Sequence, residues 1–282
     1  MRKYKLNEDF FKIIDTEEKA YLLGFLFADG YINEKLFYVD ITLHMKDKEI
    51  LNIFVKYLYP EGRPLSKIRK NYLRLIINSK VLVSNLVKHG CMQAKTFKIK
   101  FPEIPNILQK DFIRGYFDGD GCISSSNDSL TISFIGTIEF LDKLNKILDN
   151  NCNLNETIYD KRYKERDNNI RSLRFGGNII INRIYHYIYD NSNLYLKRKK
   201  DVFLEVLENK SYFCDNNFTR NSHQKYFEYE GQIYNKSELA LILSNISDLN
   251  KSTIRKKLTN GWSIHDIINT PLNKRRINNI SI

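Results

Sequence analysis

The feature that most constrains this chain is an internal repeat. Residues 19–32 read KAYLLGFLFADGYI, and residues 110–123 read KDFIRGYFDGDGCI. Two segments that agree at a fixed offset of 91 residues predict two copies of one supersecondary unit. The matched residues are Gly24 with Gly115, Asp29 with Asp120, and Gly30 with Gly121.

The sequence that follows each copy also repeats. An alternating apolar and polar stretch, typical of a half-buried strand, precedes a helical pattern, a basic hairpin-like stretch and a closing helix. Each half therefore has the order helix–strand–strand–helix–strand–strand–helix, which predicts an α+β fold of two αββαββα repeats. The stretches are 38–44, 46–58, 67–75 and 79–89 in the first half, and 129–134, 138–148, 159–175 and 178–189 in the second.

The repeated segment itself is predicted to be a buried helix that ends at an Asp-Gly pair. Residues 21–30 are apolar on almost every side, which is typical of a helix in a core or an interface. Gly24 costs about 1 kcal/mol relative to alanine in a helix interior, so we expect another backbone to pass close by. Because Gly115 has the same place in the second copy, the two helices are predicted to form an interface with pseudo-twofold symmetry. Gly30 and Gly121 suit a left-handed helix stop.

The aspartates of the two copies stand at an unusual position. A carboxylate at a helix C-terminus faces the negative end of the helix dipole, and a second carboxylate nearby adds repulsion. A divalent cation between Asp29 and Asp120 would relieve both effects, and carboxylates combined with water and phosphate suit Mg²⁺. A single Asp-Gly after an apolar helix is also an ordinary turn, but two copies at one offset favour a metal site. Such a site beside basic residues is suited to phosphodiester hydrolysis.

The charge of the chain favours a polyanionic partner. The net charge is +12, which indicates nucleic acid first and an acidic membrane surface second. Residues 111–150 form an acidic island of net charge −4 around the second Asp-Gly pair. No apolar run is long enough to span a bilayer, no signal core follows the N-terminus, and the cysteines form no CxxC pair. We therefore expect an intracellular protein with free thiols that is neither secreted nor in a membrane.

Residues 22–30 and 113–121 resemble the two signature helices of the LAGLIDADG homing endonucleases. The first segment reads LLGFLFADG and the second reads IRGYFDGDG. The family pattern also matches Asp118 in the second copy, whereas Phe27 stands where the family often has an acidic residue. The resemblance covers about residues 15–208.

The resemblance implies a monomer in which one chain mimics a homodimer. Two saddle-shaped antiparallel sheets would lie in the major groove of a long double-stranded DNA site, pseudo-palindromic or asymmetric, as in intron homing. Asp29 and Asp120 would hold Mg²⁺, or another divalent cation such as Mn²⁺, and both DNA strands would be hydrolysed. Lys95 and Lys199 are candidates for the basic residue near each active centre, and a solvated charge run is the alternative for either. A non-cleaving protein of the same fold, an RNA maturase or a transcription regulator, is the alternative function.

The hairpin stretches supply the expected DNA contacts of this fold. Because basic residues recur in matched stretches of both halves, we expect them to face DNA, some at phosphates and some at bases. They are Lys67, Arg69 and Arg74 in the first half, and Lys161, Arg171 and Arg174 in the second.

The tail beyond a polar linker has its own signature. Short helices, tight turns and a basic middle helix favour an all-α, helix-turn-helix-like DNA-binding module, and a small packing domain without a DNA role is the alternative. Asn250 is placed to cap the middle helix, and Gly261 to end it in a left-handed turn. Trp262 is expected to fill the small core. The predicted helices are 237–243, 250–258 and 263–268, and the DNA-contacting candidates are Lys251, Thr253, Arg255 and Lys256.

These patterns divide the chain into four parts. The expected boundaries place the first repeat at 1–109, the second repeat at 110–212, a linker at 213–225 and the module at 226–282.

Overall fold

The computed structural model of the chain contains two compact units, Met1–Lys210 and Ser211–Ile282, and each is described by itself. Within the described residues, no helix is long and apolar enough to cross a bilayer. The residues that the structure describes are 3–93, 97–126, 129–152, 154, 158–160, 169–208 and 226–269.

The first repeat consists of seven main elements in the predicted order. They are α1 (Glu17–Asp29), β1 (Tyr31–Asn33), β2 (Tyr38–His44), α2 (Lys48–Leu58), β3 (Ser66–Arg69), β4 (Tyr72–Asn78) and α3 (Lys80–Lys88). The strands form an antiparallel sheet in the order β1-β2-β4-β3. Helix α1 begins earlier than predicted because the side chain of Thr16 accepts a hydrogen bond from the backbone N–H of Lys19 and caps it.

The second repeat has the same elements and the same strand order. They are α4 (Gln109–Asp120), β5 (Cys122–Ser126), β6 (Ser129–Thr137), α5 (Ile138–Cys152), β7 (Ile158–Asp160), β8 (Ile170–Gly176) and α6 (Asn178–Tyr189). The sheet order is β5-β6-β8-β7, which repeats the order of the first sheet, so the predicted α+β class with two αββαββα repeats is confirmed. A further helix, α7 (Lys197–Glu208), follows the second repeat and was not predicted from the sequence.

One hydrophobic core runs through both repeats. On β2 the side chains of Val39, Ile41 and Leu43 are buried, whereas Thr42 between them is exposed. This period of two means that the first sheet packs one face against α1, α2 and α3 and turns its other face away from them. The second sheet follows the same rule, with Leu130, Ile132 and Phe134 buried on β6.

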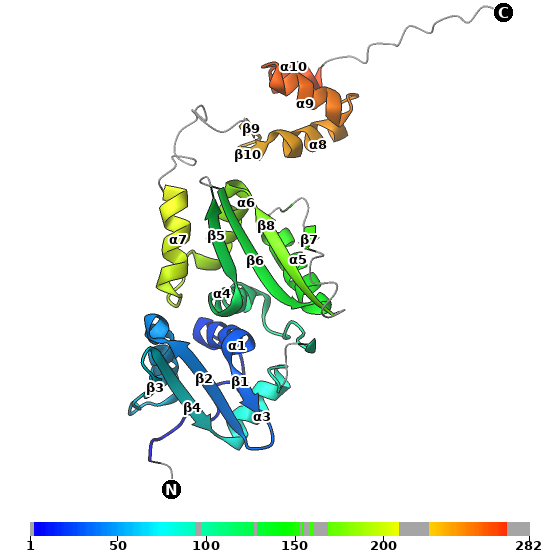
Figure 1. The fold of residues 1–282 in the computed structure, drawn as a ribbon. Coiled ribbons are helices and arrows are strands. Elements are labelled where there is room, and N and C mark those ends of the chain that lie inside the picture. Colours follow the sequence, from blue (N-terminus) through cyan, green and yellow to red (C-terminus); the bar gives the residue numbers. More distant parts are fainter. Residues whose placement is uncertain are drawn as a thin grey trace, which may run out of the picture. The chain divides into compact units, whose positions relative to one another are not determined.

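Helices α1 and α4 lie side by side at the centre of the first unit, with one sheet beyond each helix (Figure 1). A Cβ atom added to Gly24 would lie 2.1 Å from the carbonyl oxygen of Phe112, and one added to Gly115 would lie 2.0 Å from that of Tyr21. These contacts are equivalent because Tyr21 and Phe112 are also separated by the repeat offset of 91 residues. Each helix thus presents the same surface to the other, as pseudo-twofold symmetry requires.

The glycines of the Asp-Gly pairs end their helices differently from the prediction. Gly30 has a φ of −75° and Gly121 a φ of −63°, so both are extended and the predicted left-handed stop was wrong. Glycine suits these positions instead because there is no room for a Cβ atom. An added Cβ would lie 2.7 Å from the carbonyl oxygen of Leu26 in the first case and 2.5 Å from that of Phe117 in the second.

The described part of the C-terminal unit includes a hairpin of β9 (Tyr226–Tyr229) and β10 (Gln232–Asn235), so the prediction of an all-α module was wrong. The turn residues Glu230 and Gly231 have φ angles of 50° and 75°, the positive values that tight two-residue hairpin turns need. The sequence signal was an Asn/Asp-Gly-like turn, here Glu-Gly, between two short aromatic stretches.

Three helices follow the hairpin, as predicted. They are α8 (Lys236–Ile246), α9 (Lys251–Thr259) and α10 (Ile264–Ile268). Asn250 caps α9 by accepting a hydrogen bond of 2.9 Å from the backbone N–H of Thr253, and Gly261 has the expected positive φ of 81°.

Trp262 does not fill the core of this unit, which corrects the prediction. Its side chain is 45% exposed, and the ammonium of Lys257 lies 3.3 Å from the ring centroid. Aliphatic side chains from all three helices, including Ile254, Leu258 and Ile267, already fill the small core and leave the indole at the surface.

Candidate active site

Asp29 and Asp120 lie at the meeting point of α1 and α4. Each is the exposed last residue of its helix. The residues just before them touch: a Cβ added to Gly119 would lie 2.3 Å from the Cβ of Ala28 and 3.6 Å from Oδ2 of Asp29. Because Ala28 and Gly119 are small and related by the repeat offset, they bring the two helix ends together on the pseudo-twofold axis.

Lys199 binds the end of α4. The ammonium donates to the carbonyl oxygens of Phe117 at 2.6 Å, Gly119 at 3.2 Å and Gly121 at 2.6 Å. It thereby binds carbonyls at the helix end, of which that of Phe117 also accepts the backbone N–H of Gly121, and it opposes the negative end of the dipole. Burial lowers the pKa of Lys199 to about 8, although the nearby carboxylates of Asp118, Asp29 and Asp120 favour the charged form.

The position of Lys199 modifies the electrostatic argument made from the sequence. At α4 a buried cation of the chain itself already offsets the helix dipole. Arg198, the residue before it, pairs with Asp47 at 2.7 Å, and this pair ties α7 to the first repeat. The other predicted lysine, Lys95, lies outside the described residues.

Asp118 joins three elements through one buried carboxylate. It accepts hydrogen bonds from the hydroxyls of Tyr21 at 2.8 Å and Tyr189 at 2.7 Å, and from the backbone N–H of Leu196 at 2.7 Å. Desolvation raises the pKa of Asp118 against the effect of these donors, and burial raises the pKa of both tyrosines well above its usual value. Since Leu196 lies directly before α7, this contact fixes the start of the helix that carries Lys199.

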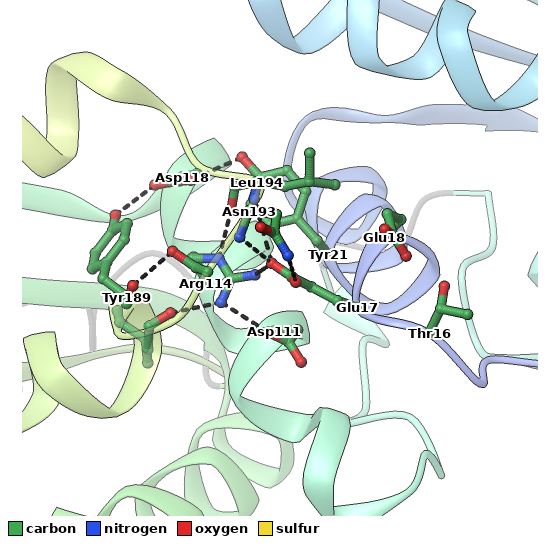
Figure 2. A network of polar contacts seen from close by, with 12 residues as sticks. Thr16, Glu17, Glu18, Tyr21, Asp111, Arg114, Asp118, Tyr189, Asn193 and Leu194 are labelled. Carbon is green, nitrogen blue, oxygen red and sulfur yellow. Dashed lines mark hydrogen bonds and ion pairs between the residues drawn. The ribbon is translucent and has the colours of Figure 1, made fainter.

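Arg114 forms a second buried group next to Asp118 (Figure 2). Its guanidinium is fully buried and donates to the carboxylates of Asp111 at 2.8 Å and Glu17 at 2.7 Å. It also donates to the carbonyl oxygens of Ile188 and Leu194, both at 2.7 Å. The network therefore joins α1 and α4 to the segment that leads from α6 into α7.

Sequence reasoning missed this network. The available signal was a charged residue inside an apolar helix pattern, namely Arg114 between Ile113 and Gly115. Buried charges are almost always paired, so such a residue predicts partners, but its partners are distant in the sequence and the repeat does not identify them.

On the first sheet, the register decides which predicted basic residues share the uncovered face. Arg74 on β4 lies opposite Thr42, and Arg69 on β3 lies opposite Tyr72, so both are on this face. Lys67 pairs with Leu73, whose side chain is buried, and is therefore on the other face. The expectation that these three face DNA together is not supported for Lys67.

On the second sheet, the side chains of Arg174 and Arg171 lie on opposite faces. Arg174 on β8 lies opposite Ser133 and is exposed, whereas Arg171 has the parity of Leu173 and Phe175, which are buried. Arg171 and Arg174 are three residues apart, and an odd separation along a strand places two side chains on opposite faces. This parity was overlooked in the sequence. The remaining hairpin candidate, Lys161, lies outside the described residues.

In the C-terminal unit, the basic residues gather on α9. Lys251, Arg255 and Lys256 are exposed, and Thr253 is half-buried beside the cap of the helix. Since Ile254 and Leu258 form the buried side of α9, these basic residues lie on its solvent side.

The chemistry of the helix ends fits a hard divalent cation. The donors are two exposed carboxylates, and within the described ranges no group of three or more His, Cys, Asp or Glu could hold a metal ion. Mg²⁺ keeps several waters and binds through one or two carboxylates with phosphate, so two carboxylates at an open surface suit it better than a closed protein cage would. Asp29 and Asp120 are the residues that would hold it.

The comparison with known families follows this geometry. Residues 108–196 match the family model described as the LAGLIDADG-like domain. The match lies within the second repeat and the segment that follows it. The resemblance inferred from the sequence is therefore confirmed over α4 to α6, and the first repeat has the same strand order.

Two relatives and one solved structure illustrate the similarity. The chain is 27% identical over 203 residues to an uncharacterized protein of Methanocaldococcus jannaschii. The aligned region covers 68% of this chain and 66% of that protein. It is also 25% identical over 199 residues to a probable translation initiation factor IF-2 of the same organism. That aligned region covers 67% of this chain and 16% of that protein. The chain thus spans less than two thirds of either relative. Among solved structures, it is similar to the LAGLIDADG meganuclease I-AabMI bound to uncleaved DNA, with 14% identity, a TM-score of 0.45, and 67% of this chain and 89% of that chain covered.

Proposed function

We propose that this chain is a site-specific endonuclease that cuts both strands of double-stranded DNA with Mg²⁺ or a similar divalent cation. The observation that carries the proposal is the meeting of Asp29 and Asp120 at the paired ends of α1 and α4. A single chain supplies both carboxylates, so a monomer is sufficient. A bound cation would activate water and stabilise the leaving oxygen of a phosphodiester.

The residues around the two aspartates have distinct roles in this proposal. Asp29 and Asp120 are the residues that would hold the cation near the scissile phosphates. Lys199 fixes the carbonyls at the end of α4, and its buried charge adds positive potential beside the anionic substrate. Asp118 and Arg114 hold α1, α4 and the start of α7 in one arrangement, so that the carboxylates keep their spacing.

The rest of the chain would bind DNA. Arg69, Arg74 and Arg174 lie on the uncovered sheet faces, where they can reach phosphates and base edges. The basic side of α9 would bind further DNA as a tethered second site, which raises the affinity of the whole chain.

The test is a cleavage assay on the DNA that flanks the gene, with Mg²⁺ and with EDTA. Asp29→Asn and Asp120→Asn should each abolish double-strand cleavage while DNA binding persists, because each removes a metal ligand and leaves the basic surface intact. Asp201→Asn is the matched control, since Asp201 is an exposed carboxylate on α7 that pairs with Lys197.

Wild-type cleavage rates in either aspartate variant would disprove the metal site. DNA or RNA binding without Mg²⁺-dependent cleavage in the wild type would favour the alternative, a non-cleaving transcription regulator or RNA maturase.

A further inference from the structure

The uncovered face of the first sheet carries an oriented arginine. The side chains of Asp40 on β2 and Arg74 on β4 both belong to this face. Nε of Arg74 lies 3.0 Å from Oδ1 of Asp40, and Nη2 lies 2.5 Å from Oδ2. The guanidinium is thus held along its Nε–Nη2 edge by both oxygens of one carboxylate, and Asp40 raises the pKa of Arg74.

Neither stability nor phosphate binding accounts for this pair. The side chains of Arg74 and Asp40 are half-buried at a sheet face that solvent reaches, and an ion pair near solvent contributes only about 0–1 kcal/mol to folding. The carboxylate of Asp40 would also repel a phosphate and cancel the charge with which Arg74 could attract one. Asp40 weakens the general attraction of this face to DNA. We therefore explain the carboxylate by its effect on the orientation of the Arg74 guanidinium.

The pair leaves the end of the guanidinium available. Asp40 accepts hydrogens from Nε and Nη2, whereas the outer fork of Nη1 and Nη2 still has donors for a second planar partner. Two parallel donors match O6 and N7 of guanine in the major groove, the commonest specific contact of arginine with DNA. An antiparallel sheet can enter that groove.

We propose that Asp40 orients Arg74 to read one guanine in the bound DNA, so that Arg74 is a specificity-determining residue and Asp40 its positioning residue. The inference rests on the proposed binding of double-stranded DNA, and it is independent of cleavage.

The second sheet provides the contrast. Arg174 faces the same way from β8, but its cross-strand neighbour on β6 is Ser133, which has no charge. The position of β6 that corresponds to Asp40 is this same Ser133, because Tyr31 pairs with Asp40 and Cys122, 91 residues later, pairs with Ser133. Among the side chains that the structure describes, no carboxylate pairs with Arg174, which suits it to a phosphate contact.

The experiment uses the full chain and a double-stranded DNA library of random sequence. Bound DNA is selected and sequenced, and affinity for an unselected random duplex is measured over a range of salt concentrations. The variants are Arg74→Ala, Asp40→Ala and Arg174→Ala. Glu61→Ala is the matched control because it removes an exposed carboxylate from the turn after α2, and thermal unfolding of each variant confirms folding.

The proposal predicts that Asp40→Ala lowers the preference for guanine but does not lower the affinity for random duplex. Preference for guanine at one base pair should fall on the order of tenfold, as in Arg74→Ala, because one bidentate contact is lost. Affinity for the random duplex should stay equal or increase, because a negative charge is gone. Glu61→Ala should change only the random-duplex affinity. Arg174→Ala should lower the salt slope by about one and leave the guanine preference intact.

Two results would be decisive against the proposal. If Asp40→Ala keeps the preference that Arg74→Ala loses, Asp40 does not orient the arginine. If Arg74→Ala is folded and keeps every base preference, Arg74 reads no base, and the Asp40–Arg74 ion pair only links β2 to β4. A wild-type chain that binds no duplex would instead overturn the proposed function itself.

Discussion

The ends of α1 and α4 have the same backbone and the same Asp-Gly pair, but they are built from different side chains. The second repeat has Arg114 and Asp118 where the first has Leu23 and Phe27, related by the offset of 91 residues. All four side chains are buried. Phe27 packs edge-on against Phe112 with the ring centroids 5.1 Å apart, whereas Asp118 binds three donors.

The difference shows that one helix pair can be closed either by apolar packing or by a polar network. The polar half gains connections that the apolar half lacks, because Asp118 and Arg114 also bind the segment that leads into α7. Those connections place Lys199 at the end of α4. The two halves are therefore equivalent in their backbone contacts and unequal in the groups that surround the aspartates.

The largest expected effect separates the two ways of closing the interface. Arg114→Met should lower the free energy of unfolding by about 3–5 kcal/mol, because it leaves the buried carboxylate of Asp111 and the half-buried carboxylate of Glu17 without their cation. Leu23→Met, at the equivalent position of the first repeat, should cost less than about 1.5 kcal/mol. Urea unfolding followed by circular dichroism measures both. Equal losses would mean that the polar network contributes no more than ordinary packing.

The matched glycines test whether the backbone contacts are equivalent. Gly24→Ala and Gly115→Ala should each cost about 1–3 kcal/mol or somewhat more, because each added methyl meets a carbonyl oxygen of the facing helix. The two losses should agree closely, since the contacts are 2.1 Å and 2.0 Å. Thermal unfolding of the two variants checks this. A clear inequality would show that the polar network makes the helix pair more rigid on one side.

The smallest expected effect concerns Lys199 and appears only as pH changes. The folded chain holds the pKa of Lys199 at about 8, below its usual value of 10.5. Between these values the unfolded state binds more protons, so the stability contributed at this position rises with pH. Wild type should gain on the order of 1–3 kcal/mol relative to Lys199→Met from pH 8 to pH 10.5.

The measurement for Lys199 is chemical unfolding at closely spaced pH values, with Lys200→Met as the control from the next position of α7. If the difference between wild type and Lys199→Met is constant with pH, the ammonium is not desolvated at the end of α4.

The repeat allowed the fold to be predicted because it can be read locally. Matched glycines, aspartates and strand alternation follow from spacing alone, and they predicted the element order and the α1–α4 pairing. The network around Asp118 could not be predicted this way, because its partners Tyr189 and Leu196 are about 70 to 80 residues distant and no repeat relation connects them.

The errors have equally specific causes. Lys67 and Arg171 were grouped with other basic residues by composition, whereas the parity of a strand separates them. The position of Trp262 depended on how much volume the aliphatic side chains fill, which no spacing rule gives. The hairpin before α8 was missed because Glu is an uncommon residue at a positive φ, which concealed the turn.

The contact between Ala28 and Gly119 limits how far the two halves can diverge. These residues stand one position before the aspartates and touch across the axis, although neither has a functional group. The surrounding side chains differ in charge between the two halves, as Asp118 and Phe27 illustrate. A bulkier side chain at the point of contact would instead push the two carboxylates apart. Sequence drift in a duplicated chain of this kind is therefore restricted at Ala28 and Gly119 as well, although both residues are chemically inert.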